Sequence, residues 1–280
     1  MRKKLNRSIG GNVFSLCLLI LLGTFMALPL IYVVSNAFKP LEELFVYPPR
    51  FFVVNPTTQN FKDMVQILAQ SRVTFTRYLF NTMFITIVGT FGHLFIASMA
   101  AFVVSRHKFP GKQFIFKLIV LSLMFTPSVT SVSSFIIMSR IKLLDTYWAI
   151  LLPAFQSTLG LYLMKQFMDT LPEAVFESAR IDGANEFKIY WKIAMPMVKP
   201  AWITLIILMV QNLWNTQSQY IFSEQMKSLP QAMQQILAGG ISRTGVASAV
   251  SFLMMLVPLC VFVFSQSQVI ETMTTSGIKE

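Results

Sequence analysis

Six long apolar runs constrain this chain more than any other feature of its sequence. A helix needs about 20 apolar residues to cross the hydrocarbon core of a bilayer, and each run is close to that length. The pattern therefore predicts an all-α integral membrane protein with six transmembrane helices. The six predicted spans are residues 13–35, 79–104, 118–139, 146–164, 201–223 and 246–270.

The composition agrees with a membrane protein. Of the 280 residues 54% are hydrophobic and only 12% are charged, whereas a soluble domain carries about 25% charged residues. The net charge of +11 does not indicate a nucleic-acid partner, because the Lys and Arg residues flank the apolar runs instead of forming a basic stripe with aromatics. Cys17 and Cys260 lie inside apolar runs, so we predict neither a disulfide nor a metal site.

The first run follows a basic N-terminus, which also fits a signal peptide. Residues 10–38 contain no charge, and this run is longer than the apolar region of a signal peptide. No small-residue cleavage site follows it. We therefore expect an uncleaved first helix, and three domain segments: a cytoplasmic N-terminus at 1–12, a six-helix permease domain at 13–270 and a cytoplasmic tail at 271–280.

The basic residues predict the orientation. Six spans put both termini on one side, and that side holds 14 of the 23 basic residues, in its shorter loops. Positive loops face the cytoplasm, so we expect a multi-pass protein of a bacterial cytoplasmic membrane with both termini cytoplasmic. The fourteen are Arg2, Lys3, Lys4, Arg7, Arg106, Lys108, Lys112, Lys117, Lys165, Arg180, Lys188, Lys192, Lys199 and Lys279.

The predicted cytoplasmic loop 165–199 carries strong signals for two short helices. Thr170, with Glu173 three residues later, predicts a capping box. Gly183 is suited to the left-handed conformation that ends a helix. Asn185 then caps a second helix, which Pro196 is expected to break.

The first of these helices has a face of small residues. Ala174, Ser178 and Ile181 follow one side, and Val175, Ala179 and Asp182 lie beside them. Such a face predicts a surface for docking another protein, and a helix lying on the membrane is the alternative. An acidic cluster favours docking, because anionic lipid headgroups repel it. The cluster is Asp169, Glu173, Glu177, Asp182 and Glu186.

This loop resembles the EAA loop of the membrane subunits of binding-protein-dependent ABC importers. The matching residues are Glu177-Ser178-Ala179, Gly183 and the later Ile193-Ala-Met-Pro196. Ser178 and Met195 depart mildly from the family's Ala and Leu. Further stretches resemble the shorter permease subunit of the maltose-type sugar importers: Phe38-Lys-Pro, Pro48-Pro-Arg-Phe, Ser105-Arg-His-Lys-Phe-Pro and Leu143-Leu-Asp-Thr-Tyr-Trp-Ala.

The resemblance implies a type I ABC importer permease fold and a function in sugar or oligosaccharide import. It implies that the coupling helix docks on a cytoplasmic ATPase through Glu177, Ser178, Ala179, Asp182, Gly183 and Ala184. The implied partners are a second homologous permease subunit, two ABC ATPase subunits, an extracellular or periplasmic solute-binding protein, the sugar and membrane lipid. The chain has no phosphate-binding Gly-x-x-x-x-Gly-Lys-Ser/Thr loop. We therefore expect a non-catalytic subunit without a cofactor, with ATP and Mg bound by the partner ATPases.

The fifth run carries the candidate substrate pathway: Asn212, Trp214, Asn215 and Gln219. The three amides are expected on one helical face, where they would bond sugar hydroxyls while the indole stacks on a sugar ring. The alternative is that the amides join helices and the aromatics form an interfacial belt. His93, in the second run, is expected to be a hydrogen-bonded packing residue, with a proton relay as the alternative.

The polar segment 224–245 is predicted to be an outer loop. Its Gln-rich composition suits a flexible finger, and Leu229-Pro230 resembles the family segment that faces the binding protein. The predicted contacts are Leu229, Pro230, Gln231 and Gln234, and a plain connecting loop is the alternative.

The sequence does not favour two other function classes. An ion-coupled secondary transporter usually shows internal repeats and charges within its spans, and neither is evident here. A membrane enzyme needs a catalytic constellation, and none is evident. The sequence does not specify the sugar, and the lack of charge in the spans favours a neutral oligosaccharide.

Overall fold

The computed structural model describes residues 9–69, 73–125, 127–238, 240 and 243–276, and every regular element in these ranges is a helix. The chain divides into two compact units. One comprises Met1–Leu68 with Met233–Leu253, and the other comprises Ala69–Ala232 with Met254–Glu280. The two units are described separately below.

In the first unit, the chain that follows the long apolar helix is held by buried polar side chains. Lys39 is buried, and its Nζ donates to Asn36 Oδ1 at 2.7 Å and to the Arg50 carbonyl at 2.5 Å. The buried Glu43 accepts from the backbone N of Val54 at 2.8 Å. These bonds hold the chain that links α1 to α3. The unit contains α1 (Ile9–Ala37), α2 (Leu41–Leu44), α3 (Gln59–Ala69), the end of α13 (Leu229–Leu237) and the start of α14 (Thr244–Ser276).

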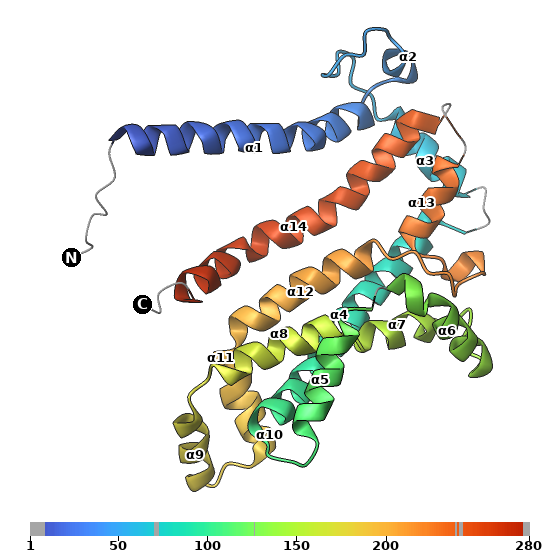
Figure 1. Ribbon diagram of the computed structural model, residues 1–280. Helices are drawn as coiled ribbons and strands as arrows, with labels where there is room; N and C mark the ends of the chain where they lie inside the picture. Colours follow the sequence, from blue (N-terminus) through green and yellow to red (C-terminus); the bar gives the residue numbers. More distant parts are fainter. Residues whose placement is uncertain (1–8, 70–72, 126, 239, 241–242, 277–280) are drawn as a thin grey trace. The chain divides into compact units, whose positions relative to one another are not determined.

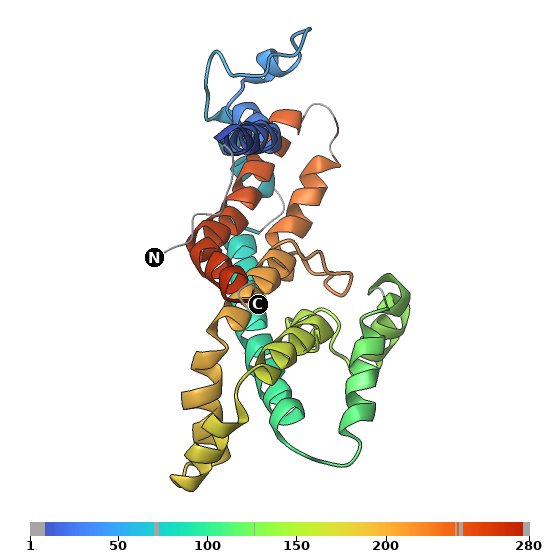
Figure 2. The same cartoon turned by 60° about the vertical axis from the view of Figure 1, so that its left-hand side comes forward.

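The second unit is built around α4 (Phe75–Arg106), which packs against α7 (Trp148–Phe155), α8 (Thr158–Asp169) and α12 (Lys199–Trp214) (Figure 1, Figure 2). Its core runs along the C-terminal half of α4 and across α8 and α12. The remaining elements are α5 (Lys112–Ser122), α6 (Pro127–Arg140), α9 (Glu173–Ile181), α10 (Glu186–Ile189), the π-helical turn η1 (Tyr190–Ala194), α11 (Met195–Met197) and the 3-10 turn η2 (Glu224–Met226).

Two glycines let the helices of this unit approach closely. A Cβ on Gly92 of α4 would lie 2.3 Å from Cε1 of Phe155, and a Cβ on Gly160 of α8 would lie 2.0 Å from Nε2 of His93. Neither distance is sterically possible, and the atoms that stand in the way belong to rings. The contacts of α4 with α7 and α8 therefore require glycine at both positions.

Three described helices are long and apolar enough to cross a membrane, namely Gly10–Ala37, Phe75–Arg106 and Thr244–Gln266. They contain most or all of the first, second and sixth predicted spans. The bent pair Glu186–Met197 and Lys199–Trp214 would make a fourth.

The other predicted spans are interrupted. The third is divided between α5 and α6, because the helix stops before Pro127 and a new helix starts there. The fourth is divided between α7, which contains Pro153, and α8. The fifth ends as a helix at Trp214 instead of residue 223.

Candidate functional site

The coupling segment, residues 170–198, starts differently from the sequence prediction. Thr170 is the C-cap residue of α8, and its Oγ1 donates to the Phe167 carbonyl at 2.7 Å. The residue before α9 is Pro172, without a side-chain cap. The predicted capping box is therefore wrong, because the Thr170 hydroxyl is used to finish the preceding helix.

The end of α9 confirms the prediction for Gly183. This residue has φ +77° and follows the C-cap Asp182. The N–H of Gly183 donates to Arg180 O, and the N–H of Ala184 donates to Ala179 O, both at 3.0 Å. This pair of bonds is the Schellman pattern, which needs a left-handed residue at the glycine.

The second short helix also starts as predicted. Asn185 Oδ1 accepts from the N–H of Lys188 at 2.8 Å. The break expected at Pro196 instead falls at Val198, because Pro196 occupies an early position of α11, where its missing donor costs little. The helix directions before and after this break differ by 78°.

The inner face of α9 is part of the protein core. Phe176 is fully buried and Ala179 is 8% exposed, in one cluster with Phe102 of α4, Ile189 and Tyr190. The prediction that Ala179 keeps the outer surface small is wrong, because its side chain faces the chain's own core.

The outer face of α9 carries the other predicted residues. Glu177, Ser178, Asp182 and Gly183 are exposed, and Ala184 is half-buried and packs against the core. Ile181, which the sequence places on the same face as Ala174 and Ser178, is 86% exposed.

Arg106, at the end of α4, was missed by sequence reasoning. Its guanidinium donates to the carbonyls of Met168 and, at 2.8 Å, Leu171. It also lies 4.3 Å from the ring centroid of Phe176 and 3.7 Å from a carboxylate oxygen of Glu173. The side chain is only 6% exposed. One residue therefore contacts α8, its connection to α9, and α9 itself.

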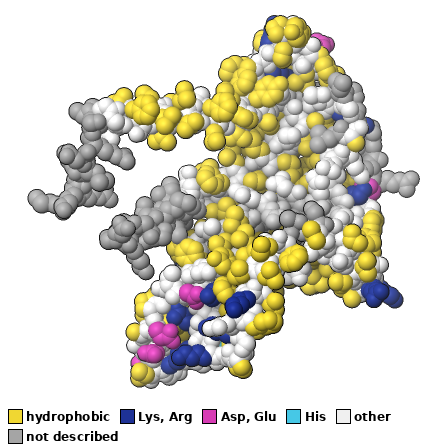
Figure 3. Space-filling model, in the orientation of Figure 1, with side chains coloured by type: hydrophobic (Ala, Val, Ile, Leu, Met, Phe, Trp, Pro, Cys, Tyr) yellow, Lys and Arg dark blue, Asp and Glu magenta, His cyan; other side chains and the backbone are white. Residues whose placement is uncertain are grey.

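Charged side chains of both signs cover the outer part of this segment (Figure 3). Arg180 Nε donates to Glu186 Oε1 at 2.8 Å, and His107 Nε2 lies 3.5 Å from the other oxygen of Glu186. The hydrogen bond from Arg180 lowers the pKa of Glu186 against a smaller opposing effect of burial. Three of the five residues in the predicted acidic cluster, Asp169, Glu173 and Glu186, are thus paired with bases of this chain.

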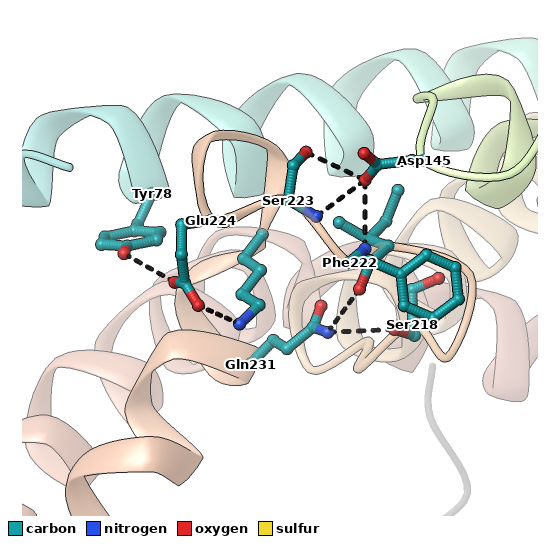
Figure 4. A network of polar contacts seen from close by, with 9 residues as sticks. Tyr78, Asp145, Ser218, Phe222, Ser223, Glu224 and Gln231 are labelled. Carbon is teal, nitrogen blue, oxygen red and sulfur yellow. Dashed lines mark hydrogen bonds and ion pairs between the residues drawn. The ribbon is translucent and has the colours of Figure 1, made fainter. Parts of the chain in front are cut away.

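A network of polar contacts lies at the opposite end of α4, where the Tyr78 hydroxyl of α4 donates to Glu224 and Asp145, in the chain before α7, bonds the chain after α12 (Figure 4). One oxygen of Asp145 accepts from the N–H of Phe222 at 3.0 Å and from the N–H and hydroxyl of Ser223, both at 2.9 Å. Burial opposes ionisation of this carboxyl, but the three hydrogen bonds outweigh it and lower its pKa.

Asn81 of α4 is the central residue of a second group of contacts. It is fully buried, and its Nδ2 donates to the carbonyls of Gln225 at 2.8 Å and Lys227 at 2.9 Å. Its Oδ1 accepts from the Tyr147 hydroxyl at 2.7 Å. The irregular chain after α12 is thus bonded to α4.

The predicted flexible finger is a packed helix at its start. α13 begins at Leu229, which is 1% exposed and donates its N–H to Thr82 Oγ1 at 2.7 Å. Pro230 is buried, and Gln231 Nε2 donates to the carbonyls of Ser218 and Ile221. Gln234 alone of the four predicted residues is exposed.

The candidate pathway residues do not share one helical face. Asn212 is exposed on α12, but Asn215 is its C-cap and Gln219 lies beyond the helix. Trp214 is 2% exposed and donates its Nε1–H to the Met254 carbonyl at 3.0 Å. Trp214 is therefore a packing residue in this structure, whereas the three amides are accessible.

His93 is a hydrogen-bonded packing residue, as predicted. It is fully buried, and its Nδ1 lies 3.0 Å from the Phe155 carbonyl at the end of α7. In the described ranges no three His, Cys, Asp or Glu residues come together in a way that would hold a metal ion.

The described elements are all helices, and three of them are long and apolar enough to cross a membrane, as in a membrane permease. The family model for the binding-protein-dependent transport system inner membrane component matches residues 93–274, which is more than half of the chain. The chain therefore belongs to this family.

Individual relatives agree with the family. Protein LplC of Bacillus subtilis (strain 168) is 31% identical over 208 residues, which are 73% of this chain and 68% of that protein. The arabinooligosaccharides transport system permease protein AraQ of Halalkalibacterium halodurans is 27% identical over 255 residues, 90% of each chain.

A solved structure has the same fold. It is that of a bacterial ABC transporter involved in the import of the acidic polysaccharide alginate. One of its chains aligns with a TM-score of 0.80 and 21% identity, over 94% of this chain and 99% of that chain.

Proposed function

We propose that this permease carries sugars or oligosaccharides from an external binding protein into the cytoplasm, driven by two separate ABC ATPase subunits. It pairs with a second homologous permease subunit to form the pathway. The proposal draws on the named substrates of two relatives, arabinooligosaccharides and alginate, and on the resemblance to the maltose-type permeases.

The observation that carries the coupling role is the presentation of α9. Its inner face is fixed by buried Phe176 and Ala179, while Glu177, Ser178 and Ile181 are exposed on its outer face. An apolar side chain surrounded by polar ones suits a protein partner. We propose that this outer face enters a cleft on an ATPase subunit.

A neutral oligosaccharide is the substrate that the candidate pathway favours. The exposed amides of Asn212, Asn215 and Gln219 offer neutral donors and acceptors for hydroxyls. After Lys199, α12 carries no charged side chain that would pair with a uronic acid.

The proposed topology has six spans with both termini in the cytoplasm. In it, α5 with α6 and α7 with α8 form the third and fourth spans, because backbone breaks are tolerated in a membrane when protein atoms satisfy the freed groups. The test is thiol labelling of Ser276→Cys after Cys17 and Cys260 are changed to Ser. Labelling only in permeabilised cells is expected, and labelling of intact cells contradicts the topology.

Docking is tested by Gly183→Val, with Gly111→Val as the matched control. Both glycines have positive φ and open space around the position of a Cβ, so both substitutions strain the backbone alike. We expect Gly183→Val to abolish co-purification of the ATPase and sugar uptake. Gly111→Val should keep both, and Gly183→Asn should restore much of the loss because Asn tolerates the left-handed conformation.

A direct test of the whole proposal is purification of the assembled complex and reconstitution into vesicles. ATP-dependent uptake should require the binding protein and respond to neutral oligosaccharides in preference to acidic ones. Uptake driven by an ion gradient without ATP would instead support a secondary transporter.

A further inference from the structure

The side chain of Arg106 is only 6% exposed although it lies at the end of a long helix, and its contacts join three segments. Met168 and Leu171, whose carbonyls it binds, lie at the end of α8 and directly before Pro172. Carbonyls at a helix end lack donors from their own helix, and Pro172 removes one more donor. The Met168 carbonyl also accepts from the N–H of Leu171 at 3.3 Å, and the guanidinium adds a second donor there and a donor for the Leu171 carbonyl.

The same guanidinium holds α9 itself. Its position 4.3 Å from the Phe176 ring centroid fits a cation–π contact, and Glu173 adds an ion pair at the start of the helix. Phe176 in turn lies near Phe102 of α4, with ring centroids 6.4 Å apart. A rotation of α9 away from α4 would break all of these contacts together.

The segment that follows α9 is also joined to α4. The ring of Tyr190 lies 5.6 Å from that of Phe102, and its hydroxyl is 2.7 Å from Ser98 Oγ. Closely packed contacts of this kind have low compressibility and transmit strain. We propose that α9 and α4 move as one body during transport, and that Arg106 is the positioning residue that joins them.

This inference rests on the proposed docking role of α9 and extends it. Force from an ATPase bound to α9 would pass directly into α4, and through α4 into the helices that pack on it. A hinged arm, bending at residues 170–172 and at Gly183, is the competing arrangement. It would allow α9 to follow the ATPase while α4 stays in place.

The decisive measurement is the distance between α4 and α9 during the ATP cycle. Spin labels at Val103→Cys and Val175→Cys, both exposed positions, would be placed in a complex that lacks Cys17 and Cys260. We expect one narrow distance distribution with and without ATP. In Arg106→Met the distribution should broaden or shift when ATP is added. A distance that changes with ATP in the chain that keeps Arg106 overturns the proposal.

The functional arm compares Arg106→Met with Arg180→Met. Arg180 is a suitable control because it has a carboxylate partner on the same segment but is 35% exposed. We expect Arg106→Met to keep ATPase attachment while sugar uptake per ATP hydrolysed falls about tenfold. Arg180→Met should change the ratio less than twofold. Equal ratios for the two variants overturn the proposal.

Two further variants keep the test decisive. Arg106→Lys retains the charge but not the planar fork, and an intermediate ratio is expected. Phe176→Leu removes the ring under the guanidinium and should lower the ratio even if Arg106→Met does not assemble; an unchanged ratio in Phe176→Leu contradicts the proposal. The docking proposal is tested separately. If α9 is not the docking site, Gly183→Val keeps normal attachment of the ATPase, whatever the Arg106 variants show.

Discussion

The two ends of α4 are bonded to their neighbours in different ways. At one end, Phe102 and the cation–π contact of Arg106 hold short regular helices, and Arg106 also donates to two backbone carbonyls where α8 ends. At the other end, Asn81 of α4, together with Asp145 of the chain before α7, holds the largely irregular chain between α12 and α13, and their bonds go mainly to backbone groups of that chain. The first end thus combines packing of rings and a cation with two hydrogen bonds to a helix end, whereas the second has mainly side-chain hydrogen bonds to an irregular backbone.

The difference follows from the backbone that each end must accommodate. A helix satisfies its own N–H and C=O groups, so a neighbour need only cover its side chains. An irregular segment leaves those groups open, and buried ones must be bonded by side chains. The α9 end should therefore respond most to changes of side-chain volume, and the other end to loss of single hydrogen-bonding atoms.

The largest expected effect is that of Ala179→Trp at the α9 end. Because Ala179 is buried in the core, an indole there should lower the free energy of unfolding by about 3 kcal/mol, measured by denaturant titration in detergent. The control, Ala174→Trp, lies on the exposed side of the same helix. It should keep the stability and lose ATPase attachment. Equal stabilities for the two variants would show that Ala179 does not face the core.

At the other end, Asn81→Ala should cost about 2 kcal/mol. The substitution removes the bonds of Asn81 to the carbonyls of Gln225 and Lys227 and to the Tyr147 hydroxyl, while Arg77 still donates to Gln225 and Tyr147. Thermal unfolding in detergent measures the loss. Asn212→Ala removes an exposed amide and should shift the stability by less than about 0.5 kcal/mol. If both variants lost the same stability, the burial of the Asn81 amide would not explain its contribution.

A smaller effect, about 1 kcal/mol, is expected for Asp145→Asn. The pKa of Asp145 is lowered in the folded protein, so its carboxylate stabilises the fold above the unfolded value near 3.9. That contribution disappears as the pH falls from about 4 through the lower folded pKa. The free energy of unfolding of the variant should therefore fall less steeply between about pH 5 and pH 2. Parallel pH profiles would contradict this assignment.

The smallest effect is expected for Glu186→Gln. The pair with Arg180 is partly exposed on both sides, and such pairs contribute about 0–1 kcal/mol, less at high salt. We expect a loss of at most about 0.5 kcal/mol that vanishes in 1 M salt. A large, salt-independent loss would mean that the surface charges, and not the aromatic packing, hold the α9 end together.

Local signals in the sequence predicted a large part of the coupling segment. Gly183 and Asn185 act through backbone conformation and a bond three residues away, so neighbouring residues suffice to recognise them. Thr170 failed because two helix ends compete for its hydroxyl. Which end binds the hydroxyl depends on the residue at which α8 stops, and the sequence pattern did not predict that residue.

Contacts between distant residues were not predictable in the same way. The inward position of Ala179 depends on Phe102 and Tyr190, and the role of Arg106 depends on carbonyls more than 60 residues away. Leu229 and Gln231 looked like loop residues because their neighbours are polar. Their packing comes from Thr82 and Ser218. Apolar length predicted the long helices, but not the interruptions near Pro127 and Pro153.

The glycines at the contacts of α4 have a consequence for how this permease could be altered by random mutagenesis. At Gly92 and Gly160 even alanine is excluded by a neighbouring ring, whereas exposed positions on the same helices accept many residues. A saturation library would therefore yield almost no functional clones at these two codons. Laboratory selection for a new substrate should find its solutions at accessible polar positions such as Asn212 and Gln219, where the scaffold does not limit the choice.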